Sequence, residues 1–313
     1  ASNNTAVGKN ALAANTTGTN NVAVGAYALD ANTTASNNTA IGHGSLTSAT
    51  TATENTAVGR ASMTNTTTGG YNVAVGSGTL YTNVTGANNV AVGRDALLMN
   101  TASNNTALGF HALTANTTGG NNAAVGTYAL DANTTGAGNV ALGYNALGAN
   151  TTANDNIAIG YEALKLNTTG TRNIAVGAYC GDALTTGNDN VAMGYFSLSA
   201  ATTGTQNVAL GMNALAAGTT ASSNVAIGAY ALDAATTAGS NIAIGLYALS
   251  SANSGNNVAI GSYSLQDLST GTQNCAVGRN TMLELTTGNY NTAVGAYAMQ
   301  NSTTGSSNVA IGY

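Results

Sequence analysis

Apolar and polar residues alternate in one short motif that recurs along the whole chain. Asn-Val-Ala-Val-Gly at residues 21–25 is typical, with Val at the second and fourth places and Asn, Ala and Gly at the others. A period of two over so few residues predicts a β-strand and is too short for a helix. One face of the predicted strand carries Val and Val, and the other carries Asn, Ala and Gly.

The glycine that closes each motif is an anchor from which the repeat can be numbered. Sixteen of the eighteen intervals between the nineteen anchors are 17 residues long, and two are 16. The anchors are Gly8, Gly25, Gly42, Gly59, Gly76, Gly93, Gly109, Gly126, Gly143, Gly160, Gly177, Gly194, Gly211, Gly228, Gly245, Gly261, Gly278, Gly295 and Gly312. A short, strict period predicts a solenoid of stacked coils. Counted from the anchor, position −4 is always Asn and position −2 is always Ala.

A second short strand is predicted after each anchor, as in AYAL at residues 26–29, followed by a turn around Thr-Thr-Gly. The fold class is therefore all-β, a parallel β-solenoid of about 18 coils with a rise of about 4.8 Å per coil. In one coil Gly181 stands at the usual Leu position and Leu184 follows three residues later. There we expect a local rearrangement of the second strand without a break in the stack.

Composition excludes several classes of function. Only 5% of the 313 residues are charged and the net charge is −5, so no basic surface can neutralise a nucleic-acid backbone. No apolar run reaches the roughly 20 residues that a bilayer-spanning helix needs, and the first residues lack a signal-peptide pattern. We interpret residues 1–313 as a single repetitive fibre segment, uncapped at both ends.

Charge placement supports the map of the coil. Every Lys, Arg, Asp and Glu lies at position −5, +1, +2, +5 or +6, so the repeated Asn to Gly segment is free of charge. A coil also has few large apolar residues with which to bury a core of its own. We therefore predict that the Asn, Ala and Gly stripe is an interface between copies of the chain, with Ala141 in it, and that Asn side chains form amide ladders along the stack.

The cysteines and histidines do not suggest a reactive centre. Cys180 stands where other coils have Ala or Ser, and Cys275 where they have Val or Thr, so both are predicted to be small fillers. They lie several coils apart, too far for a disulfide. His43 and His111 have no Cys, Asp or Glu at metal-ligand spacing, which predicts solvated or edge histidines.

Acidic residues likewise fit turns better than a site. Asp30, Asp131 and Asp233 each lie at +5, without the dense Gly and Asp nonapeptides of calcium-binding repeats. No nucleophile, paired carboxylate or phosphate-binding loop stands out. We therefore predict no enzyme activity, no metal and no cofactor.

Aromatic residues recur at +2 and predict a stripe along the stack. The stripe is densest at Tyr230, Tyr247 and Tyr263, which are candidate contacts for a glycan; packing at a corner of the coil is the alternative. Its members at +2 are Tyr27, Tyr128, Tyr179, Phe196, Tyr230, Tyr247, Tyr263 and Tyr297.

The repeat resembles a known family of fibres. NNVAVGAYAL, at residues 20–29, resembles the head repeats of trimeric autotransporter adhesins of the YadA type, and ALDANTTGAGNVALG, at residues 129–143, is similar to repeats in phage tail fibres and long surface adhesins. The resemblance implies a left-handed parallel β-roll, three chains side by side, and a role in attachment. The unit here is longer than that of the adhesin heads, with the extra residues around Thr-Thr-Gly.

Two functional hypotheses follow. In the first, the chain is an extracellular structural segment, the rigid homotrimeric shaft of a phage tail fibre or bacterial surface adhesin, whose receptor or glycan is bound elsewhere. In the second, it is an ice-binding or glycan-binding solenoid in which Thr pairs such as Thr16 and Thr17 order water. Adjacent threonines of a strand point to opposite faces, which favours a loop for these pairs.

Overall fold

The structure is a computed structural model that describes all 313 residues as a parallel β-solenoid of about 18 coils with no helix. Each coil contributes one three-residue strand at positions −3 to −1, as the alternating pattern predicts. The chain divides into two units, Ala1–Asp155 and Asn156–Tyr313. Because no helix is present, none could cross a membrane.

The first unit holds nine strands. They are β1 (Thr5–Val7), β2 (Val22–Val24), β3 (Thr39–Ile41), β4 (Thr56–Val58), β5 (Val73–Val75), β6 (Val90–Val92), β7 (Thr106–Leu108), β8 (Ala123–Val125) and β9 (Val140–Leu142). The second unit holds ten. They are β10 (Ile157–Ile159), β11 (Ile174–Val176), β12 (Val191–Met193), β13 (Val208–Leu210), β14 (Val225–Ile227), β15 (Ile242–Ile244), β16 (Val258–Ile260), β17 (Cys275–Val277), β18 (Thr292–Val294) and β19 (Val309–Ile311).

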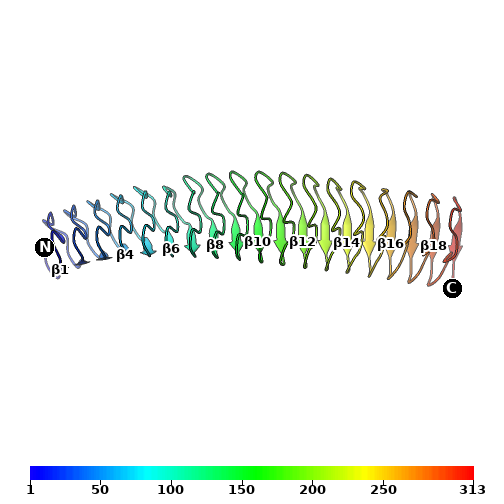
Figure 1. Cartoon of the computed structure of the whole chain (residues 1–313), viewed down its shortest axis with the longest axis horizontal. Helices are drawn as coiled ribbons and strands as arrows, with labels where there is room; N and C mark the ends of the chain where they lie inside the picture. The colour runs from blue at the N-terminus through cyan, green and yellow to red at the C-terminus, as the bar shows by residue number, and fades with distance from the viewer. The chain divides into compact units, whose positions relative to one another are not determined.

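Within each unit, successive strands lie side by side and pair in parallel (Figure 1). The register places each Ala at −2 opposite the Ala of the next coil, for example Ala23 beside Ala40 and Ala209 beside Ala226. The two 16-residue intervals leave this register intact, since Val90 still faces Thr106. Identical residues are therefore stacked along each unit.

The interior of each coil is narrow and takes mainly small side chains. From β2 to β18, Ala at −2 is at most 2% exposed, as at Ala23 and Ala209. In most coils position +3 is a buried Ala, Ser, Thr or Cys and position +4 supplies a large core residue, such as Leu130 or Leu232, to which +7 adds a second in coils such as that of Leu268. The core of each unit is thus a column of alanines beside a column of leucines.

The segment after the anchor is a succession of turns, so the prediction of a second strand is wrong. Positions +2 and +4 have left-handed backbones, with φ of 60° at Tyr27 and 49° at Leu29, and position −5 is also left-handed, with φ of 63° at Asn37. The segment still stacks through backbone hydrogen bonds, because the N–H of Leu29 donates to the carbonyl of Ser45 at 3.1 Å. Left-handed residues therefore bend the coil where extended backbone was expected.

The anchor must be glycine for two reasons that Gly177 illustrates. Its φ is +139°, a conformation that other L-residues rarely adopt. A Cβ on Gly177 would also lie only 2.6 Å from the carbonyl oxygen of Gly194 in the next coil. The anchor is thus fixed both by its own backbone and by the close stacking of the following strand.

The coil that contains Gly181 keeps the common backbone, so the predicted local rearrangement is wrong. Gly181 has φ of +59°, close to the 48° of Leu164 and 53° of Leu198 at the same position. Its N–H still donates to the carbonyl of Ser197 at 3.0 Å. Leu184 enters the core from +7 and is fully buried. Only the place from which the Leu side chain enters the core has changed.

Candidate interaction surfaces

The outer surface of the strands is an apolar stripe made by positions −3 and −1. These positions are half-buried or exposed, whereas Ala at −2 points inward. The exposed members in the central coils are Ile41, Val73, Val75, Val90, Leu108, Val140 and Leu142 in the first unit, and Met193, Ile242, Ile260 and Val294 in the second. We call these outward −3 and −1 side chains the outer stripe.

The prediction that Asn, Ala and Gly form an intersubunit face is wrong. Ala141 is 1% exposed in the single chain, and Asn139 is fully buried beside it. Both lie inside the coil, where a thin cross-section admits only small side chains. The charge-free stripe seen in the sequence is an internal one, and the outer stripe is the face of the strands that stays exposed in the single chain.

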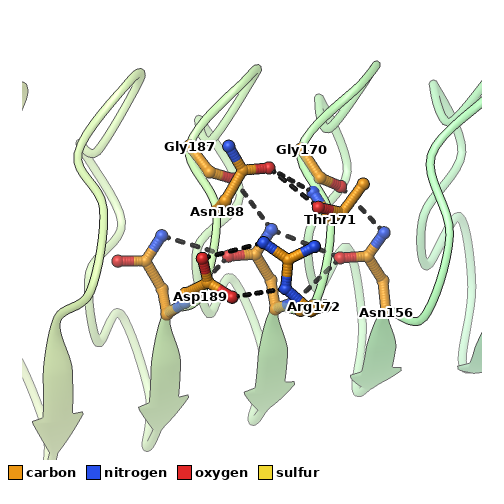
Figure 2. A network of polar contacts seen from close by, with 9 residues as sticks. Asn156, Gly170, Thr171, Arg172, Gly187, Asn188 and Asp189 are labelled. Atoms are coloured by element: carbon orange, nitrogen blue, oxygen red, sulfur yellow. Dashed lines mark hydrogen bonds and ion pairs between the residues drawn. The ribbon is translucent and has the colours of Figure 1, made fainter.

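The Asn residues at −4 form the predicted amide ladder, inside the coil (Figure 2). The Asn173 backbone N–H donates to Asn156 Oδ1 at 2.9 Å, and its Nδ2 donates to the Gly187 carbonyl at 2.8 Å. The Asn156 Nδ2 likewise donates to the Gly170 carbonyl at 2.9 Å. Each amide thus ties its coil to a neighbour and closes the loop of its own coil.

A second Asn ladder, at +7, occupies much of the first unit. Asn133 Nδ2 donates to Asn116 Oδ1 at 2.8 Å and to the Gly136 carbonyl at 3.0 Å. The pattern is interrupted where Ala49 follows Asn32, and the Asn32 Oδ1 is buried there without a hydrogen bond. This ladder was not predicted, although the recurrent Asn at +7 in these coils is visible in the sequence.

The paired threonines at +8 and +9 lie in bends, as predicted. The first hydroxyl of each pair donates along the stack, for example from Thr117 Oγ1 to the Thr134 carbonyl at 2.9 Å and from Thr185 Oγ1 to the Thr202 carbonyl at 2.9 Å. The second Thr is exposed, as at Thr118 and Thr186. One row of Thr hydroxyls therefore donates hydrogen bonds between the coils of each unit, and the other row faces solvent. Ice binding stays a prediction.

The aromatic stripe is a stack of rings at its densest part. Tyr230 and Tyr247 have ring centroids 4.9 Å apart and planes 8° apart, and Tyr247 and Tyr263 follow at 5.7 Å and 15°. All three side chains are half-buried. Because Tyr247 has a ring on each side, it presents its edge to solvent. A glycan contact here stays a prediction, and the stacking also provides the corner packing offered as its alternative.

Further aromatic residues lie at +1, a position the sequence analysis did not include in the stripe. In the second unit Tyr161 and Tyr195 are exposed, and each has its ring edge-on to Tyr179, at 5.3 and 6.3 Å. In the first unit Tyr144 is exposed and is edge-on to Tyr128 at 6.2 Å. The aromatic surface of each unit is thus two residues wide where +1 and +2 are both aromatic.

The two cysteines are free and differ in exposure. Cys180 is buried at +3, and burial raises the pKa of its thiol to about 12. Cys275 lies at −3 in β17, on the outer stripe, and is half-buried. Cys275 is therefore the accessible thiol of the two.

Some of the charged residues form local pairs. Arg172 binds Asp189 of the next coil through Nε at 2.6 Å and Nη2 at 2.9 Å, and these hydrogen bonds lower the pKa of the Asp189 carboxyl (Figure 2). His43 is exposed, and His111 places its Nε2 3.5 Å from Asp95 Oδ2. No three His, Cys, Asp or Glu side chains gather as a metal site would require.

Asp30, Asp131 and Asp233 lie in the turn segment, as predicted. Burial raises the pKa of the Asp131 carboxyl, against an opposing effect of His111, and burial also raises the pKa of Asp233. Asp182, at the same +5 position, has a raised pKa for the same reason.

Comparison of the chain with protein-family models gave no match, and comparison with curated proteins gave none either.

Proposed function

We propose that the chain is a structural segment of a fibre, a rigid shaft in which three copies pack in parallel through their outer stripes. In this proposal the shaft is extracellular, is wound as a left-handed β-roll, and carries a receptor-binding element of a phage tail fibre or bacterial surface adhesin. The resemblance of the repeat to adhesin heads and tail fibres supports the trimer and the role in attachment.

The observation that carries the proposal is the outer stripe itself. Val73, Val75 and Val90 in the first unit, and Ile242 and Ile260 in the second, leave more than a third of their surface exposed. A row of mostly aliphatic side chains, half-buried or exposed in every coil, is unfavourable in water and marks a contact surface. No charged residue lies at −3 or −1 in any coil.

A second copy of this chain is the partner that fits. The stripe repeats in every coil, and its strands keep their register through the two 16-residue intervals, as where Val90 faces Thr106 and Ile242 faces Val258. Another copy in parallel presents the same row of side chains at the same spacing along its whole length. The stripe is also narrow, two residues per strand, which suits packing of a few chains around a common axis.

The test compares an outward and an inward substitution in β15. Ile242→Glu places a charge on the outer stripe, where Ile242 is 38% exposed, and we expect a folded monomer by circular dichroism and mass photometry. Ala243→Glu places the charge in the coil, where Ala243 is fully buried, and we expect loss of the β spectrum. The unsubstituted chain should have the mass of a trimer. A folded, unsubstituted monomer at micromolar concentration contradicts the proposal.

Cys275 offers an independent test of contact between copies at the outer stripe, and this test does not require a destabilising substitution. It lies on the outer stripe, whereas Cys180 is buried and its thiol has a pKa near 12. Mild oxidation should therefore link copies through Cys275, and Cys275→Ser should abolish the link while Cys180→Ser leaves it. Equal crosslinking of the Cys275→Ser variant would show that the copies do not meet at this stripe.

A further inference from the structure

A hollow of about 530 Å³ opens on the turn segments of three successive coils in the first unit. It exists because the middle coil has Ser77 and Gly78 at +1 and +2, where most coils have larger side chains. Arg60 and Arg94 stand at +1 of the coils on either side. The lining residues lie at +1, +2, +5 and +6, so the hollow is separate from the outer stripe and does not depend on assembly.

The cation at one wall is Arg60. Its side chain is exposed and makes no ion pair, in contrast to Arg94, whose Nε binds Asp95 Oδ2 at 3.1 Å. Of the six Lys and Arg residues in the chain, these two are the pair that borders one hollow. A guanidinium fork that is not paired is suited to bind a carboxylate in a bidentate way. Arg60 thus supplies a site for one negative charge.

Asp95 lies opposite and has a different role. Its Oδ2 faces Arg94 and His111, while its Oδ1 leans over Gly78, where it occupies the space that a side chain would take. The Oδ1 is therefore an acceptor that points into the hollow. It would repel a simple anion, but it would accept hydrogen bonds from hydroxyl groups.

The remaining wall is amphipathic. Tyr81 is 39% exposed and lines the hollow, with no aromatic or cationic side chain against its ring. Leu98 and Met99 continue the apolar surface, and the Ser77 hydroxyl is available for a hydrogen bond. An aromatic face beside a few convergent polar groups is the usual composition of a small-molecule site.

We propose that this hollow binds a sugar acid, a hexuronate unit, with its carboxylate on Arg60, its hydroxyl groups on Asp95 Oδ1 and Ser77, and its ring against Tyr81. A sugar acid is the ligand class that needs a cation, an acceptor and an aromatic face together. A neutral sugar would not use Arg60, and a small inorganic anion would be disfavoured by Asp95.

The test is titration of the full chain with D-glucuronate, D-glucose and acetate, followed by saturation-transfer NMR and calorimetry. We expect glucuronate to bind at least tenfold more tightly than glucose or acetate, on the order of one charge-assisted hydrogen-bond pair. Equal affinity for glucose or for acetate overturns the assignment. A tetramer of galacturonate tells whether the ligand is a polysaccharide or a free sugar acid. Binding tighter than that of monomeric galacturonate indicates a polysaccharide, and equal binding indicates the free acid.

Three variants locate the site. Arg60→Gln should weaken glucuronate binding about tenfold, in keeping with loss of the same interaction. Gly78→Asn should also block it, because its side chain would enter the space that Asp95 Oδ1 occupies and displace that acceptor; other coils carry Asn at +2 with similar φ, as at Asn145. Arg279→Gln is the matched control, since Arg279 is the +1 residue of another coil and lies over the Tyr297 ring. Unchanged binding by Arg60→Gln, with the β spectrum retained, refutes the proposal.

Discussion

The two units fill position +7 of nearly the same coil in two different ways. In most coils of the first unit the position is polar, with Ala49 as the exception, and it includes Asn83, Asn100, Asn116, Asn133 and Asn150. In the second unit Asn167 continues the polar run, and the later coils are mostly apolar at this position and include Leu184, Ala201, Ala235, Ala252, Leu268 and Leu285. All of these residues are buried. The strands pair in the same register in both units, so the backbone does not depend on the choice.

The difference separates an indispensable ladder from an optional one. In the first unit the loop carbonyl at +10 receives two amides, as when Gly136 accepts from Asn122 at 2.8 Å and from Asn133 at 3.0 Å. In the second unit the Ala221 carbonyl accepts from Asn207 at −4, at 2.8 Å, and position +7 of that coil is Gly218. The amide at −4 is present in every coil and is sufficient to close the loop.

Replacing the Asn at −4 is therefore expected to cause the largest loss in the free energy of unfolding. Asn207→Ala removes the acceptor of the Asn224 N–H, at 3.1 Å, and the donor to the Ala221 carbonyl. Several buried groups lose their partners, each at roughly 1–3 kcal/mol, so the free energy of unfolding should fall by about 3 kcal/mol or more. Denaturant titration followed by circular dichroism measures it. A loss below about 1 kcal/mol would mean that water replaces the amide.

A smaller loss in the free energy of unfolding is expected when an apolar side chain, as found at +7 in the second unit, replaces an Asn at +7 of the first unit. Asn133→Leu removes bonds to Asn116 and Gly136 and one donated by Asn150, but it adds an apolar side chain of the kind that Leu268 buries. The two effects oppose each other, and we expect a net loss of about 1 kcal/mol. If this loss in the same denaturant titration equalled that of Asn207→Ala, the ladder at +7 would be as essential as the one at −4.

Extending the +7 ladder should stabilise the first unit. Ala49 is fully buried between Asn32 and Thr66, and the Asn32 Oδ1 has no hydrogen bond. In Ala49→Asn the new amide can donate to Asn32 Oδ1 and to the Ala52 carbonyl, which we expect to add about 1 kcal/mol. The midpoint of thermal unfolding should rise by a few degrees, roughly as such a gain predicts. A fall in the midpoint would show that the coil has no room for the amide.

The smallest expected change in stability comes from the ionisation of the half-buried aspartates. Burial raises the pKa of Asp233 above its unfolded value, so the native state binds more protons between the two values and this carboxyl destabilises the fold as pH rises through that interval. Asp233→Asn should therefore raise the unfolding midpoint at pH 7 and leave it unchanged near pH 3. The gain is at most about 0.5 kcal/mol, because the carboxylate keeps part of its solvent. An equal gain at both pH values would exclude ionisation as the cause.

Periodicity alone predicted the strand, the coil length and the stacking register. It could not predict which strand face is internal, because alternation is symmetrical and Val looks more suited to a core than Asn or Ala. The thin coil reverses that preference: Ala141 and Asn139 fit inside, whereas Val140 and Leu142 do not. Charge-free positions were then attributed to an interface when they mark the interior.

The turn segment was missed for a related reason. Residues such as Ala26 to Leu29 look compatible with a strand, but the residues at −5, +2 and +4 are never Val, Ile or Thr in any coil. β-branched side chains are disfavoured in left-handed backbone, so this absence was a signal for positive φ. The hollow beside Arg60 could not be found from the repeat, since it depends on side chains of three coils and on the absence of one at Gly78.

The left-handed residues also bear on how the chain folds. Most coils carry three non-glycine positions with φ near +50° to +60°, such as Asn121, Tyr128 and Leu130, at roughly 1 kcal/mol or more apiece. A lone coil has no neighbours to compensate for them. Favourable energy comes only from the interfaces between coils, as in a one-dimensional array of coupled units. Folding should therefore have a nucleus of several coils, after which each added coil is downhill, and cooperativity should rise with the number of repeats.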